Sequence, residues 1–111
     1  MTKKIGTVLL AGLLLTACSP QDPFDQMMTT SREGRDKETL QLAEGLLGDP
    51  QTPDIVKART EMTVALVHIR SKQWTEARAA LSRAKDLGLE SDTGYFKDQL
   101  PQYEAWIPGA H

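Results

Sequence analysis

Few residues in this 111-residue chain are of types that could perform catalysis or bind a metal ion. Cys18 is the single cysteine, and His68 and His111 are the only histidines. A thiol can act as a nucleophile and an imidazole as a ligand, but a metal site needs three or four converging ligands. The neighbours of His68 one helical turn away are Val64 and Lys72, which are not ligands. We therefore expect no metal site, and a His68 ring that is packed against its neighbours or lies in an interface.

Sequence motifs that accompany catalysis are absent from the chain. It contains no His-Glu-x-x-His pair, no glycine-rich phosphate loop and no nucleophile elbow. The acidic residues are scattered, and several stand at expected helix starts, where they offset the helix macrodipole. The net charge of −2 also argues against a nucleic-acid partner, because no net positive field attracts phosphates. We expect neither an enzyme nor a cofactor.

The N-terminal segment places the cysteine in a distinctive setting. Two lysines precede an apolar run from Ile5 to Leu15. A membrane-spanning helix needs about 20 apolar residues, so this run is too short to span and fits the centre of a secretory signal. The run ends at Leu15-Thr16-Ala17-Cys18, where small residues come directly before the cysteine.

This ending resembles the lipobox of bacterial lipoproteins. The resemblance implies that residues 1–17 are a removed signal peptide, that the thiol of Cys18 carries fatty acids such as palmitate, and that residues 18–21 form a short tether. Two or three acyl chains anchor a protein to a lipid bilayer almost permanently. Ser19, where an Asp commonly causes inner-membrane retention, favours the periplasmic face of the outer membrane. The alternative is an ordinary cleavable signal that happens to end near a cysteine.

The rest of the sequence predicts one all-α domain over residues 22–107, followed by a frayed tail over 108–111. Period-two alternation is absent, whereas apolar residues at helical spacing recur together with capping signals. Asp22 and Pro23 predict the start of a helix that runs to about Arg32, and Gly34 predicts a break. Further helices are expected over 36–47, 54–71 and 74–87. The short link between the last two predicts antiparallel neighbours.

Small and large residues alternate along these last two helices. The residues concerned are Ala65, Trp74, Ala77, Leu81 and Ala84. The pattern resembles one tetratricopeptide repeat, a helix–turn–helix unit of 34 residues. The chain departs from the family pattern at His68, Lys72 and Leu89, where Tyr, Gly and Pro are usual. Residues 34–50 resemble part of a preceding, degenerate repeat. The resemblance implies short antiparallel hairpins stacked as an array, and the alternative is a plain helical bundle.

Aromatic residues gather towards the C-terminus. Four of the six, Tyr95, Phe96, Tyr103 and Trp106, lie within twelve positions. We expect a helix that starts at Ser91 or Asp92, runs to about residue 99 and is kinked or restarted at Pro101. The aromatic rings would cap the last apolar face of the repeat array, or Tyr103 and Trp106 would anchor a partner. The two roles are compatible.

These patterns predict a membrane-anchored protein-interaction module or assembly factor of the bacterial cell envelope. In the repeat family that the chain resembles, the first helices of the hairpins line a concave surface that binds peptides or partner helices. The resemblance therefore implies partner contacts at exposed polar residues of the 54–71 helix, and the candidates are Arg59, Thr63, His68 and Arg70. The expected partners are the bilayer, through acylated Cys18, and a periplasmic or outer-membrane protein. Fewer than three full repeats are marginal for stability, so self-association is a further expectation. The alternative is a structural or protective envelope lipoprotein without a peptide groove.

Overall fold

The computed structural model describes residues 22–109, apart from the side chain of Tyr95. Within this range the chain forms five α-helices and one short 3₁₀ helix, with no strand, so the all-α prediction is confirmed. In chain order the elements are α2 (Pro23–Arg32), α3 (Asp36–Gly48), α4 (Asp54–Arg70), α5 (Trp74–Asp86), η2 (Leu89–Ser91) and α6 (Tyr95–Trp106). The first four α-helices lie within one residue of their expected bounds.

Local sequence explains where these helices begin and end. Pro23 opens α2 after Asp22, which occupies the N-cap position without a side-chain capping bond. Gly34 and Gly88 have φ values of 76° and 96°, a left-handed conformation that glycine adopts without steric cost. Lys72, in the α4–α5 turn, adopts the same region with φ of 59°. This turn therefore has a left-handed residue that is not glycine.

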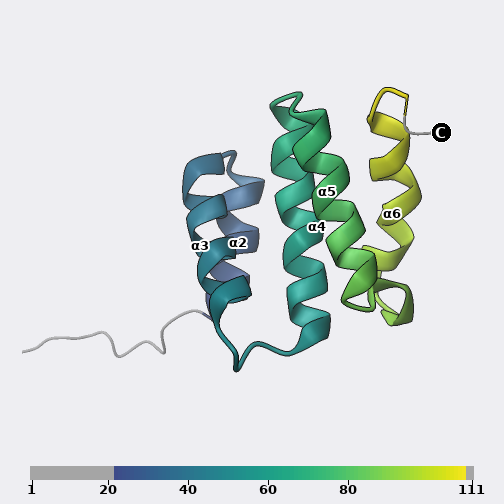
Figure 1. Cartoon of the computed structure of the whole chain (residues 1–111). Coiled ribbons are helices and arrows are strands. Elements are labelled where there is room, and N and C mark those ends of the chain that lie inside the picture. The colour runs from purple at the N-terminus through teal and green to yellow at the C-terminus, as the bar shows by residue number, and fades with distance from the viewer. Residues whose placement is uncertain (1–21, 110–111) are drawn as a thin grey trace, which may run out of the picture.

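The helix α4 is the centre of the domain and contacts each of the other four α-helices. Figure 1 shows α4 and α5 as antiparallel neighbours, with α3 in front of α2 on one side and α6 on the other. Small residues let α4 and α5 approach closely, since Ala65, Ala77 and Ala80 are fully buried at their contact. Met27 of α2 and Met62 of α4 are also fully buried and belong to the same hydrophobic core.

The last helix differs from its expected form. α6 starts after Gly94 and continues through Pro101 to Trp106, so the predicted start at Ser91 or Asp92 and the predicted restart at Pro101 are wrong, whereas a kink at Pro101 stays a prediction. A proline inside a helix costs about 3 kcal/mol. Burial on both sides of the proline offsets this cost, because Leu100 and Tyr103 are almost fully buried against the core. Packing therefore outweighs the local preference.

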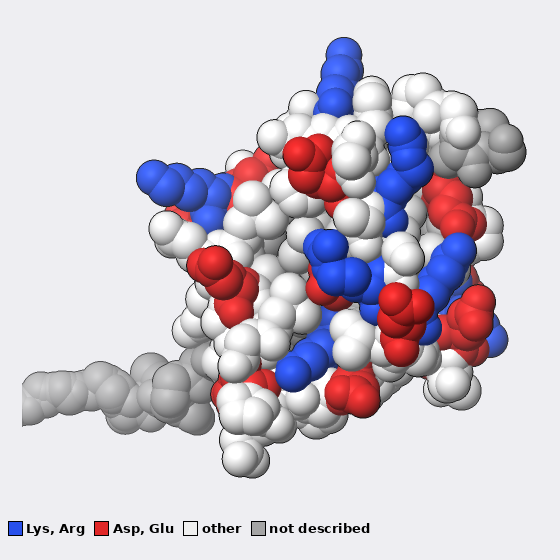
Figure 2. All heavy atoms as spheres, viewed as in Figure 1, with Lys and Arg blue, Asp and Glu red and all other residues white. Residues whose placement is uncertain are grey.

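The surface of the domain carries charges of both signs. Figure 2 shows Lys and Arg interspersed with Asp and Glu on the face that presents α3 and α5, with no extended area of one sign. A mixed surface of this kind gives no strong attraction to a polyanion. No α-helix of residues 22–109 is long and apolar enough to cross a bilayer.

Candidate partner-binding groove

Three helices, α2, α4 and α6, form the walls of a groove of about 480 Å³, which we call the α2/α4/α6 groove. Its lining residues are Phe24, Met28, Ser31, Arg32, Thr63, Leu66, Arg70, Phe96, Gln99 and Tyr103. The three helices run in the same direction in Figure 1, so their C-terminal ends lie at one end of the domain. The groove thus combines three segments that are well separated in the sequence, from Phe24 to Tyr103.

The floor of the groove is largely apolar. Phe24 of α2 and Phe96 of α6 meet edge to face, with ring centroids 6.1 Å apart and an interplanar angle of 65°. Met28 and Leu66 are partly buried and pack against the core next to them. An apolar floor with half-exposed aromatic rings can bury the side chains of a peptide or of a partner helix.

Two arginines stand at the end of the groove where α2 and α4 finish. Arg70 donates hydrogen bonds to the backbone oxygen of Ser31 at 3.1 Å and to its hydroxyl at 2.9 Å, and lies 3.4 Å from Asp36. Arg32 is exposed and donates a long hydrogen bond of 3.5 Å to Thr29. Both guanidinium groups also lie near the helix C-termini, where a cation offsets the partial negative charge of the macrodipole. Arg70 is paired with Asp36, whereas Arg32 has no acidic partner among the described residues, so the net positive charge at this end of the groove comes from Arg32.

At its other end the groove is fixed by an ion pair between α4 and the segment before α6. Arg59 donates to both carboxylate oxygens of Asp92, at 3.1 and 2.8 Å, and the backbone N–H of Gly94 also donates to Asp92 at 3.0 Å. The hydrogen bond from Arg59 holds the pKa of Asp92 below its usual value, and Asp92 raises the pKa of Arg59 in return. The Arg59 guanidinium lies 6.0 Å from the ring centroid of Phe96. The pair thus positions the start of α6 beside the groove.

The structure brings together several of the residues that the sequence marked for partner contacts. Thr63, Arg70 and Tyr103 line the α2/α4/α6 groove, and Arg59 contacts Phe96 at its edge. Thr63 is buried, so its expected exposure is wrong: its hydroxyl donates to the Arg59 backbone oxygen and to the sulfur of Met28, because α2 packs over this part of α4. Whether these residues contact a partner stays a prediction.

The remaining two candidates lie elsewhere. His68 faces away from the groove residues on α4, and its Nδ1 lies 2.7 Å from the side-chain oxygen of Gln73. Trp106 is half-exposed and stacks on Tyr103, with ring centroids 5.4 Å apart. Tyr103 itself is buried, whereas the Trp106 ring is open to solvent, and whether the pair caps a repeat array or anchors a partner stays a prediction.

Sequence reasoning had not marked the apolar floor for binding. Met28, Leu66, Phe96 and Phe24 are apolar residues on helical faces, and such residues are usually core. One signal in the sequence could have indicated them. The helix α4 carries apolar or small residues on more than one face, as a helix with four neighbours must. Only the tertiary arrangement shows which of these faces is left partly uncovered.

The residues of the predicted lipid anchor lie outside the described range. They are Leu15, Thr16, Ala17, Cys18 and Ser19, and their role in signal cleavage and lipidation stays a prediction. Among residues 22–109, no three His, Cys, Asp or Glu side chains gather closely enough to hold a metal ion. No family model matches the chain, and no curated protein or solved structure shows significant similarity to it.

Proposed function

We propose that this chain is a lipid-anchored protein-interaction module of the bacterial cell envelope, which holds a peptide or helix of a partner in the α2/α4/α6 groove. The single observation that carries the proposal is the composition of this groove. It combines an apolar floor with a cationic end, and it gathers Thr63, Arg70 and Tyr103 from two helices that are far apart in sequence. Apolar anchors surrounded by polar groups are the usual composition of a protein interface.

The arrangement of helices supports a tetratricopeptide-like interpretation of this module. In that interpretation α2 and α3 form one hairpin, α4 and α5 form the next, and α6 is the capping helix. The contacts of α2 with α4 and of α4 with α6 are those expected if the first helices of successive units line one surface. The buried alanines of α4 and α5 and the left-handed turn at Lys72 also fit the unit.

The predicted anchor gives the module its location. If Cys18 is acylated, only residues 19–21 separate the lipid from Asp22, a distance of about 10 Å when extended. The N-terminus of α2 would then lie close to the bilayer, which suits a factor that assists assembly of an envelope complex. We propose the periplasmic face of the outer membrane as its location, on the basis of Ser19.

Photo-crosslinking of the full chain in intact bacterial cells tests the binding surface. A photoreactive amino acid at Gln99, in the groove, should form a defined adduct with one envelope protein. The same group at Ala79, which is exposed on α5, is the matched control and should not form this adduct. The substitution Leu66→Arg, which introduces a charge into the groove floor, should abolish the adduct from Gln99. Equal adducts from both positions, or no adduct from Gln99, would contradict the proposal.

Mass spectrometry of the mature chain tests the anchor independently. The expected polypeptide begins at Cys18 and carries at least two fatty acyl groups. An unmodified thiol in a correctly folded chain would refute the lipid anchor but leave the groove unaffected. The two parts of the proposal can therefore fail separately.

A further inference from the structure

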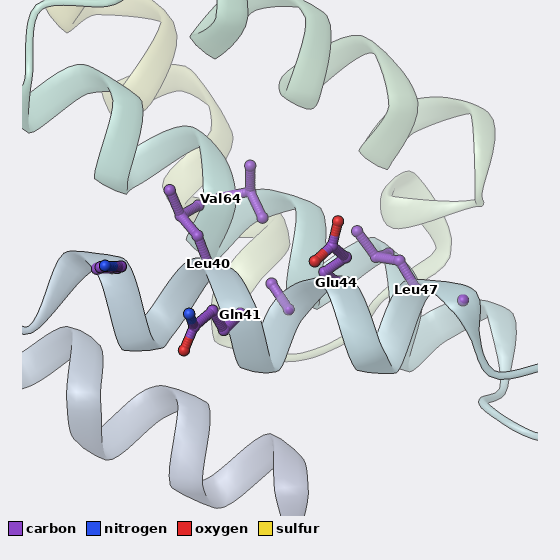
Figure 3. Close-up of a pocket in the computed structure, with 8 residues that line it drawn as sticks. Leu40, Gln41, Glu44, Leu47 and Val64 are labelled. Carbon is purple, nitrogen blue, oxygen red and sulfur yellow. The ribbon is translucent and has the colours of Figure 1, made fainter.

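A second groove lies between α3 and α4, on a different face from the α2/α4/α6 groove. It measures about 630 Å³, and its lining residues are Lys37, Leu40, Gln41, Ala43, Glu44, Leu47, Gly48 and Val64. Figure 3 shows Leu40, Glu44 and Leu47 projecting from α3 on the side that faces Val64 of α4. Leu40 and Leu47 are only partly buried, so this α3/α4 groove leaves apolar side chains open to solvent.

The groove carries one charge of each sign on the same helix. Lys37 and Glu44 are both exposed and are seven residues apart, which is about 10 Å along a helix axis. Within residues 22–109 neither side chain has a hydrogen bond or an ion pair. Their neighbour Arg35, by contrast, is paired with both Glu33 and Glu38. The two charges on the groove are therefore available to another molecule.

The arrangement of Lys37, Glu44 and the apolar residues between them on α3 is complementary to the same arrangement on a second copy. A twofold axis perpendicular to α3 between residues 40 and 41 would place α3 antiparallel to α3 of a second copy. Lys37 would then face Glu44 of the second copy, Glu44 would face its Lys37, and the apolar residues between them would meet. An interface with twofold symmetry needs this kind of self-complementary surface, because each residue pair occurs twice.

Two glycines lie on the exposed surface of α3. Gly45 and Gly48 are exposed, and a Cβ atom added to either would meet nothing within 4 Å. A glycine inside a helix costs about 0.5–1 kcal/mol relative to alanine, and no contact within the described domain requires one at Gly45. Gly48 lines the α3/α4 groove, and the lack of a side chain there leaves room for a second helix to approach closely.

We propose that two copies of this chain associate through α3, packed antiparallel over the α3/α4 groove, with reciprocal Lys37–Glu44 ion pairs. The balanced pair of charges favours a second copy over an anionic lipid surface, which would be attracted by Lys37 and repelled by Glu44. This contact leaves the α2/α4/α6 groove free, so a dimer would present two partner-binding surfaces.

Charge reversal in the full chain tests the proposal. Two copies with different affinity tags are produced in the same bacterial cells, extracted with excess mild detergent and purified through one tag. The wild-type copies should purify together. Lys37→Glu in both copies places acid against acid twice, and Glu44→Lys in both places base against base twice. Each should lower co-purification by about tenfold or more. Arg78→Glu, a reversal at an exposed position on α5, is the matched control and should have no effect.

The decisive sample combines the two variants. When one copy carries Lys37→Glu and the other carries Glu44→Lys, both ion pairs can form again, one with its original polarity and one with reversed polarity, so co-purification should return. Circular dichroism of each variant should show unchanged helix content, since both positions are exposed. Wild-type copies that do not purify together, or a mixed pair that is no better than either variant alone, would overturn the proposal. Neither result depends on the partner of the other groove.

Discussion

The ion pair between Arg59 and Asp92 allows a quantitative test of how α6 is held beside the groove. Arg59→Ala removes two charge-assisted hydrogen bonds, of 3.1 and 2.8 Å, from a carboxylate whose side chain is only 1% exposed. Removal of one partner from a fully buried pair costs about 3–5 kcal/mol. Here the cost is smaller, because the Arg59 side chain is 34% exposed and Gly94 continues to donate to Asp92.

We expect Arg59→Ala to lower the free energy of unfolding by about 2 kcal/mol. For a domain of this size, each kcal/mol corresponds to about 4–8 °C in Tm, so the melting temperature should fall by about 8–16 °C. Thermal unfolding of the purified chain, followed by circular dichroism at neutral pH, measures this shift. Arg78→Ala, at an exposed arginine of α5 with no ion pair in the described residues, is the control and should change Tm very little.

The pH dependence of the folding stability tests the same ion pair in a second way. The pKa of Asp92 is lower in the folded chain than the usual value of about 3.9 that it has when unfolded. The unfolded chain therefore binds the proton first as pH falls, so the stabilisation is complete above about pH 5 and is lost as pH falls towards the folded pKa. This part of the acid destabilisation should be absent in Arg59→Ala. If Arg59→Ala has the Tm and the acid sensitivity of the wild type, the Arg59–Asp92 pair does not hold α6 in place.

Two further predictions concern packing and backbone conformation. Ala80→Leu should lower the free energy of unfolding by about 1–3 kcal/mol, because Ala80 is fully buried at the α4–α5 contact. Its control is Ala79→Leu, at the exposed neighbouring position, which should change the free energy of unfolding by less than about 0.5 kcal/mol. Lys72→Gly should raise the free energy of unfolding by about 0.5–1 kcal/mol, because Lys72 has a φ of 59°, a left-handed conformation that is unfavourable for a residue with a Cβ atom. Gly88→Ala, at a φ of 96°, should for the same reason lower the free energy of unfolding by about 1 kcal/mol. Urea unfolding curves measure all four, and a destabilised Lys72→Gly would refute the backbone argument.

The helices were predictable from the sequence because their signals are local. Pro23, Gly34 and Gly88 act through backbone conformation, and the apolar spacing of α3 to α5 needs no knowledge of the tertiary structure. The prediction failed at α6 for a reason that is not local. Pro101 predicts a break by its own chemistry, but burial of Leu100 and Tyr103 on either side stabilises one continuous helix.

The candidate site was predictable only in part for the same reason. The helix that carries Thr63 and Arg70 was identified, but the sequence could not show that α2 covers Thr63 or that Ser31 accepts hydrogen bonds from Arg70. These contacts join residues more than 30 positions apart, and single-sequence periodicity contains no information on such pairs. Phe24 and Phe96, which meet at the groove floor, are separated by more than 70 positions.

The common direction of α2, α4 and α6 has a consequence for any ligand that lies along them. The charged side chains at the two ends of the groove differ in sign: Asp25 and Asp98 stand near the helix starts, and Arg32 and Arg70 near the finishes, where their full charges outweigh the opposite partial charges of the helix dipoles. An elongated ligand with unlike ends would have a lower energy in one orientation than when turned end for end. The α2/α4/α6 groove would then select a ligand by the charges at its two ends as well as by its shape.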